Sequence, residues 1–171
     1  MRPHIIIIIF VLFYYSPIAA QNKFGFVNAS EIIESMPEYE RAKQEVNKLQ
    51  QQYVNDLNLM KEEIKKKKID FDSLPVGTPQ NIKQQKEKEI SDMEEKFNQT
   101  YQDYQTQLQN KAVENMQAIS KMVRDATKIV GHEGGYIYII DTSDKQILYY
   151  SKTLAIDLTN QVKSKLNIGK K

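Results

Sequence analysis

The sequence predicts an α+β protein that is mostly helical, in which a long antiparallel helical hairpin projects from a small base of β-strands. Three observations lead to this prediction. Residues 37–130 are rich in Lys, Glu, Gln and Asn and repeat apolar residues every three or four positions, as amphipathic helices do. Pro and Gly interrupt this pattern near residues 70–80. Runs of β-branched and aromatic residues, typical of strands, flank the helical region.

The first twenty residues have the features of a secretory signal peptide. A basic start, Met1–His4, precedes an apolar run from Ile5 to Tyr15 and a small-residue end at Ala19–Ala20. The run is shorter than the roughly 20 apolar residues that a membrane-spanning helix needs. We therefore predict cleavage after Ala20, which leaves one domain over residues 21–171. The alternative is an uncleaved N-terminal anchor.

Composition and motifs argue against an enzyme. The chain has a formal net charge of +2, so bulk charge indicates no polyanionic partner, and it contains no Cys for disulfides or thiol catalysis. Neither a metal-binding His motif nor a glycine-rich phosphate loop occurs. Outside the first twenty residues the sole histidine is His132, interpreted as a solvent-exposed or capping residue. We predict no enzymatic activity, no metal and no cofactor.

The predicted elements begin with a strand over Lys23–Asn28 and a brief helix over Ser30–Met36. The S-x-x-E pattern of Ser35–Glu38 then predicts a capping box at the start of the next helix, with Pro37 in its first turn.

The helical hairpin follows from two facing apolar stripes, one from Tyr39 to Phe71 and one from Ile82 to Val130. Residues 70–80 predict the turn between them, with Thr78 as the N-cap and Pro79 in the first position of the second helix. From Ile90 the apolar steps follow an eleven-residue repeat, which predicts nearly straight arms.

The second arm is predicted to end near Val130–Gly131. A β-hairpin, GYIYIIDTSDKQILYYS, is predicted over residues 135–151, and a helix capped by Asp157 over Thr153–Leu166. The hairpin is apolar on both faces, and a lone two-stranded ribbon is marginal in water. Copies of the base covering one another would bury it, so we predict an oligomerisation element; the alternative is that helices cover both faces within a monomer. The predicted oligomerisation residues are Phe24, Phe26, Tyr136, Ile137, Tyr138, Ile139, Ile140, Ile147, Leu148 and Tyr149.

Both ends of the chain resemble the Skp/OmpH family of periplasmic chaperones. The resemblance is carried by KFGFVN at 23–28, GYIYIID at 135–141, ILYY at 147–150 and IDLT at 156–159. The family pattern is a strand ending in V-D, then G-Y-x-x-V-x-D, V-L-Y and a closing D-I-T helix. This chain departs from it at Asn28, where Asp is usual, at Met36–Glu38, which replaces a G-K-like stretch, and in its near-neutral arms.

The resemblance implies a homotrimer whose strands form a central β-barrel. Residues 21–36 and 131–171 would form the trimerisation body, and residues 37–130 the coiled-coil arm with its tip near residues 70–80. The implied function is that of an ATP-independent holdase in the periplasm, which binds unfolded outer-membrane proteins and prevents their aggregation. The alternative is a structural coiled-coil envelope protein anchored by an uncleaved N-terminal segment. Secretion makes nucleic acid a poor partner.

Two groups of arm residues are candidates for contact with partners. Lys65, Lys66, Lys67 and Lys68 form a basic patch suited to anionic lipid, lipopolysaccharide or acidic client segments. We favour the alternative, a solvated helix end whose lysines complement the helix dipole. Adaptable Met and amphipathic aromatic side chains suit weak contacts with many unfolded sequences, although most stripe residues are also expected to form the seam between the arms. The predicted client contacts are Met60, Phe71, Leu74, Met93, Phe97 and Tyr101.

Overall fold

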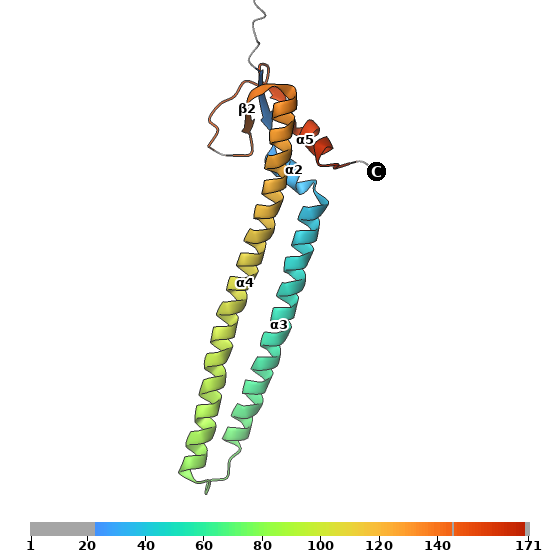
Figure 1. Ribbon diagram of the computed structural model, residues 1–171. Helices are drawn as coiled ribbons and strands as arrows, with labels where there is room; N and C mark the ends of the chain where they lie inside the picture. The colour runs from blue at the N-terminus through green and yellow to red at the C-terminus, as the bar shows by residue number, and fades with distance from the viewer. Residues whose placement is uncertain (1–22, 145, 170–171) are drawn as a thin grey trace, which may run out of the picture.

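The computed structural model of the chain describes residues 23–144 and 146–169. The predicted signal peptide, residues 1–20, lies outside this range. The described chain has a small body and one long helical hairpin, which confirms the prediction of a mostly helical fold with a small set of strands (Figure 1).

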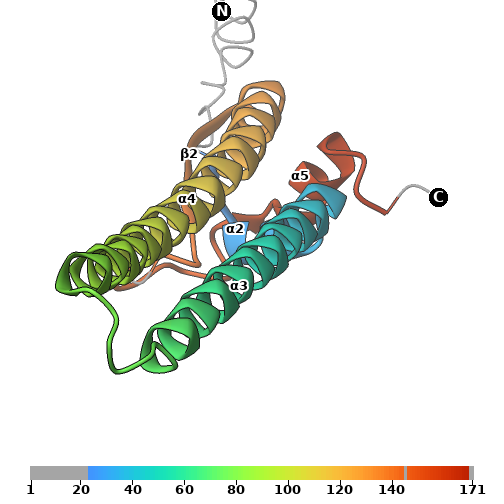
Figure 2. The ribbon, with the colours of Figure 1, turned by 90° about the horizontal axis from the view of Figure 1, so that it is seen from below.

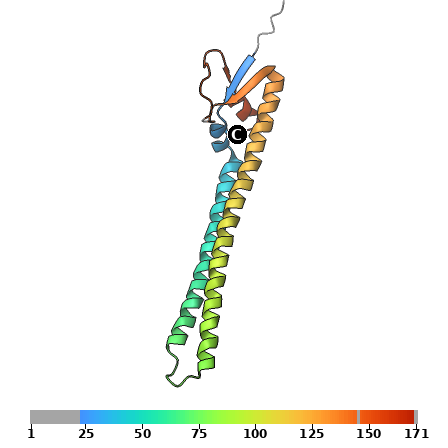
Figure 3. The same ribbon diagram turned by 90° about the vertical axis from the view of Figure 1, so that its left-hand side faces the viewer.

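The hairpin consists of α3 (Pro37–Asp72) and α4 (Gln80–Gly134), joined by a loop over residues 73–79. The two helices run side by side from the body to the tip (Figures 1 and 3), and Figure 2 shows the pair along its length from the tip. At about 1.5 Å per residue the 36 residues of α3 extend roughly 50 Å from the body. The hairpin and the position of its turn are therefore as predicted.

Among the described residues, the sheet of the body consists of three parallel strands in the order β2-β1-β3. β1 (Lys23–Val27) lies in the centre, between β2 (Tyr136–Asp141) and the two-residue β3 (Ile156–Asp157). β1 and β2 are connected through the whole helical hairpin, whose second arm returns to the body beside the start of the first. The returning chain can therefore enter the sheet in the same direction as β1.

The antiparallel β-hairpin predicted over residues 135–151 is wrong. Its first strand forms as β2, but residues 147–150 form no strand within the described chain. The reason lies at Asp141, whose Oδ1 accepts hydrogen bonds from Ser143 N at 2.9 Å and Ala29 N at 3.1 Å. Thr142 N donates to Val27 O at 2.8 Å, so the chain after β2 is bonded to β1 and α2 rather than folded back on β2.

The hydrophobic core lies where the short helices α2 (Ala29–Glu34) and α5 (Thr159–Lys165) meet the body end of α4 and one face of the sheet. Gly25 allows close packing there, because a Cβ at this position would come within 2.5 Å of Leu158 Cδ1. The core residues are Val27, Ile32, Met36, Ile119, Val123, Ala126, Val130, Leu158 and Val162.

Two of the predicted caps are wrong. The N-cap of α3 is Met36, without a side-chain hydrogen bond; Ser35 Oγ instead donates to Glu31 O at 2.6 Å, because Ser35 ends α2. The Glu38 carboxylate accepts a hydrogen bond from Arg41, so no capping box forms. At the tip, Thr78 Oγ1 donates to Pro75 O at 2.7 Å and closes the turn rather than capping α4.

Two element ends also differ from the prediction. α4 continues to Gly134, because Gly135, with φ +67°, is the glycine that leaves the helical conformation. The closing helix begins at Thr159 rather than Thr153, because Ile156–Asp157 joins the sheet. Asp157 Oδ1 accepts a hydrogen bond from Thr159 N at 2.9 Å at this helix start.

Candidate functional site: the outer face of the sheet and the helical arms

The outer face of the sheet is apolar and largely open. Side chains alternate between the two faces of a strand, and Val27 and Ile139 pack on the core side. Phe24 and Phe26 of β1 therefore point to the opposite, outer face. Phe24 stacks on Tyr138, with ring centroids 6.4 Å apart, yet the two side chains are 44% and 66% exposed.

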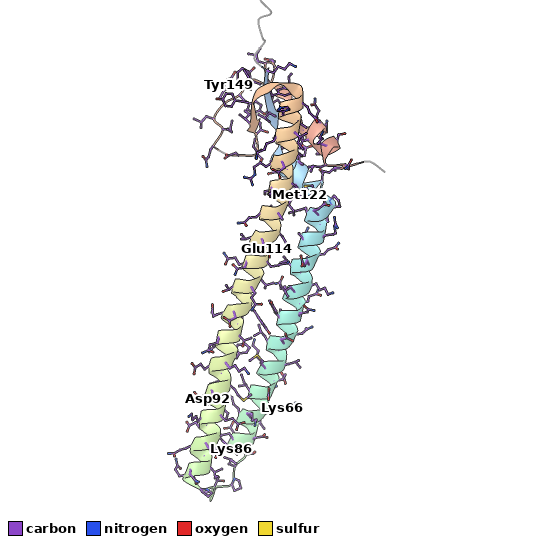
Figure 4. All side chains as sticks on the ribbon, viewed as in Figure 1. Lys66, Lys86, Asp92, Glu114, Met122 and Tyr149 are labelled. Carbon is purple, nitrogen blue, oxygen red and sulfur yellow. The ribbon has the colours of Figure 1, made fainter. Side chains whose placement is uncertain are left out.

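The segment after β2 covers only part of this outer face. The Tyr150 ring packs against Phe26, with centroids 5.0 Å apart, and a shallow pocket of about 260 Å³ remains between this segment and the strands. Leu148 and Tyr149 are 98% and 84% exposed, and Figure 4 shows Tyr149 at the body end of the molecule. Within the described chain, residues 147–150 are thus not paired in a sheet, and Ile147, Leu148 and Tyr149 remain exposed.

A second opening lies beside β2, one of the two end strands of the sheet. A groove of about 660 Å³ runs between α2, α4 and β2. Its lining includes Ile33, Val123 and Ile137, and Ile137 is 52% exposed. The body therefore presents an open sheet edge and an apolar groove next to its open outer face.

The structure divides the predicted oligomerisation residues into two groups. Tyr136 and Ile139 pack against the core of the chain itself, and Phe26 and Ile140 are half-buried. The predicted set does not include Leu154 and Ile156, which are 81% and 45% exposed, because both fall within the range predicted as the closing helix. The exposed members of the predicted set are Phe24, Ile137, Tyr138, Ile147, Leu148 and Tyr149.

The arms are packed less tightly than the body: α3 contains no buried residue. In α4 the buried residues are confined to positions 119–130, where the helix enters the body. Midway along the arms, Tyr53 and Tyr104 stack with centroids 3.8 Å apart. The Tyr53 hydroxyl donates to Gln107 Oε1 at 2.6 Å, and the Tyr104 hydroxyl to Asp56 Oδ2 at 3.3 Å.

Most of the predicted client contacts lie in the seam or at the turn. Met60, Phe71, Leu74, Met93 and Phe97 are half-buried, and Lys61 Nζ lies 5.4 Å from the Phe97 ring centroid. Tyr101 is 44% exposed. The predicted set does not include other apolar residues of the arms that are exposed. Some of them interrupt the three- and four-residue spacing of the stripes, and an apolar residue outside a stripe is the sequence signal that could have identified them. They include Val54, Leu59, Ile69, Val76 and Ile82.

The predicted basic patch is partly neutralised by α4. Lys67 pairs with Glu89 at 2.5 Å and Lys68 with Glu94 at 2.6 Å. The hydrogen bond between Lys67 and Glu89 raises the pKa of the lysine and lowers the pKa of the carboxyl group. Lys65 and Lys66 are exposed, and Figure 4 shows Lys66 near the tip, where Lys86 and Asp92 also lie.

The described residues contain no group of three or more His, Cys, Asp or Glu that could hold a metal ion. His132 is exposed in the last turn of α4. In the described part of the chain, no helix combines the length and the apolar character needed to cross a membrane.

These features define a class of protein whose surface is dominated by a pair of long exposed helices on a small, partly open sheet. The family model described as outer membrane protein (OmpH-like) matches residues 23–166, and the chain belongs to this family. The family includes periplasmic chaperones. The comparison with curated proteins found no match.

Proposed function

We propose that this chain is an ATP-independent holdase of the periplasm, which binds unfolded outer-membrane proteins and prevents their aggregation. Membership of a family that includes periplasmic chaperones supports the proposal. The observation that carries it is the arm itself: a hairpin about 50 Å long in which α3 has no buried residue and apolar side chains such as Leu59, 71% exposed, face solvent.

The body supports assembly of several such arms. Its outer sheet face, its end strand β2 and the exposed residues 147–149 offer apolar surface that sister chains can bury. We infer a homotrimer in which these surfaces form the shared body. Three arms around one client would multiply weak contacts without any single strong site.

The mechanism needs no nucleotide. Arms that bind the unfolded client but not the folded one lower the free concentration of unfolded chain by mass action alone. The basic patch of Lys65–Lys68 could add contact with anionic lipid or lipopolysaccharide, but the pairs made by Lys67 and Lys68 reduce its net field. We place the protein in the periplasm, after removal of residues 1–20 as a signal peptide.

The test is suppression of porin aggregation. A porin unfolded in urea is diluted into buffer with the purified protein, and turbidity is followed with and without ATP. We expect the protein to suppress turbidity equally in both conditions. A variant in which a short Gly-Ser turn replaces residues 57–99 should keep the number of chains per oligomer but lose suppression. Failure of the complete protein to suppress turbidity would contradict the proposed function.

A further inference from the structure

Charge is distributed unevenly along the arms. The distal residues 61–96 contain nine basic and nine acidic side chains, so half of this region is charged and its net charge is zero. The two segments 49–60 and 97–110 contain only Asp56 and Asp103 as charged residues, while twelve of their side chains are Gln or Asn. We call these two segments together the uncharged band.

The two segments of the band face each other across the arms. Tyr53 stacks on Tyr104, and their hydroxyl groups bond to Gln107 and Asp56 of the opposite helix. The ion pairs that join the arms lie outside the band. Lys67–Glu89 and Lys68–Glu94 are on the tip side, and Lys111–Glu45 is on the body side. Aromatic and hydrogen-bonding side chains therefore join the arms inside the band.

Apolar side chains in the band also remain exposed. Val54, Leu59 and Tyr101 are 49%, 71% and 44% exposed, so the pairing of the two arms leaves much of their surface uncovered. Around them the amide side chains carry both hydrogen-bond donors and acceptors. The band thus combines apolar surface with hydrogen-bonding capacity and almost no charge.

We propose that the uncharged band is the main contact surface for the client, and that it holds uncharged, extended segments of unfolded polypeptide. This inference rests on the proposed holdase function and assigns its binding surface. Such segments carry unpaired backbone N–H and C=O groups, which amide side chains can bond in either sense. Their apolar side chains can contact Val54, Leu59 and Tyr101.

The charge pattern favours this occupant over an acidic or a basic one. The band offers no cation to an acidic segment, and its two carboxylates offer little to a basic one. The distal region contains many charges but balances them, partly through pairs between the arms. Binding to an uncharged surface is also screened little by salt, unlike binding between opposite charges.

The test introduces charge of either sign at the exposed apolar positions of the band. One variant carries Val54→Glu, Leu59→Glu and Tyr101→Glu, and a second carries Lys at the same positions. The matched control carries Ile69→Glu, Val76→Glu and Ile82→Glu, three exposed apolar residues of the distal region. Helix content by circular dichroism and mass by light scattering verify that each variant retains its structure.

Binding of a fluorescently labelled porin, kept unfolded in dilute urea, is then measured by titration. We expect both band variants to raise the Kd by about tenfold or more, whereas the control changes it by less than about threefold. The Kd of the unmodified protein should change little between about 50 mM and about 500 mM salt.

Several results would overturn the inference while leaving the proposed function intact. The unmodified protein could bind the porin while both band variants bind equally well, or the distal control could lose as much affinity as they do. Opposite shifts of Kd in the Glu and Lys variants would indicate an electrostatic site instead. Absence of binding by the unmodified protein would remove the proposed function itself, and this inference with it.

Discussion

The body and the arms of this chain use similar apolar residues but pack them in opposite ways. In the body Leu158 is fully buried and Met36 is 1% exposed, whereas Leu59 in the arm is 71% exposed. Every buried apolar residue in the described chain lies in the body or in the part of α4 that enters it. The core therefore specifies the body closely, and the arms are held by a half-buried seam.

This difference suggests a division of roles, in which the body provides the stability of the fold and the arms provide the binding surface. Regions with few buried contacts open locally at low free energy, whereas a packed core opens only with the whole unit. A body that stays folded can hold its arms in place while the arms adjust to clients of different sequence. The following predictions test whether the two regions differ in this way.

The largest expected effect is loss of a body side chain. Leu158→Ala removes a fully buried side chain packed against Gly25 and should reduce the free energy of unfolding by about 2–5 kcal/mol. The matched change Leu57→Ala, in the half-buried seam, should cost about 1 kcal/mol or less. Urea unfolding at one fixed protomer concentration measures both. Equal losses would mean that the arms are packed as tightly as the body.

The second effect concerns assembly. Leu148→Lys places a charge on a side chain that is 98% exposed in the single chain, so the fold of the chain should survive. If sister chains cover this segment, the mass measured by light scattering should fall to that of one chain. Val76→Lys, at a fully exposed tip position, is the matched control and should leave the mass unchanged. A charge at Ile139 would not test assembly alone, because this side chain packs against the core of its own chain and its loss would also disturb the fold.

The sequence predicted the arms well because their pattern is local. Helical spacing, Pro37 and the turn-forming residues near 73–79 determine an antiparallel hairpin without information from elsewhere in the chain. Asn28 illustrates another local rule: its side chain accepts a hydrogen bond from Glu31 N at 3.1 Å. It caps α2 as an Asp would, so this departure from the family pattern changes no function of the cap.

The sheet was predicted poorly because its pairing is not local. Tyr136–Asp141 and Ile147–Tyr150 look like partners in sequence, but β2 pairs with β1, more than a hundred residues away. The same limit applies to the predicted oligomerisation residues. Tyr136 and Ile139 were assigned to oligomerisation by composition. Both are half-buried against the core of their own chain, and only the register of β2 against β1 reveals which face each side chain takes.

A third, smaller effect is expected at the Tyr53–Tyr104 stack. Tyr104→Ala removes the stack and should destabilise the arms by about 1 kcal/mol, whereas Tyr104→Phe keeps the ring and should change stability by about 0.5 kcal/mol or less. Hydrogen exchange of the arm amides measures the local loss, and the body amides serve as the internal control. Loss of protection in the body as well would indicate that the arms and body unfold as one unit.

The same stack gives a pH dependence at the alkaline end. Desolvation, followed by the charge and hydrogen bond of Asp56, raises the pKa of Tyr104 above its ordinary value of 10.0. The contribution of Tyr104 to stability is therefore complete below pH 10.0 and is lost as the pH rises through the higher pKa of the folded chain. Arm amides should exchange faster in this range after correction for intrinsic exchange, and Tyr104→Phe should remove that component.

The smallest effect is expected for the ion pair Lys67–Glu89, which joins exposed parts of the arms. Glu89→Gln should shift the midpoint of thermal unfolding at neutral pH by about 1 °C or less, because exposed pairs contribute little.

The hydrogen bond from Lys67 lowers the pKa of Glu89 below its ordinary value of 4.5. The contribution of this pair is therefore present above pH 4.5 and is lost as the pH falls through the lower pKa of the folded chain. Unfolding curves of the variant and the unmodified protein should converge in that acidic range. A large shift at neutral pH would show instead that ion pairs, rather than the half-buried seam, hold the arms together. The contrast between a tightly specified body and loosely specified arms would then have to be abandoned.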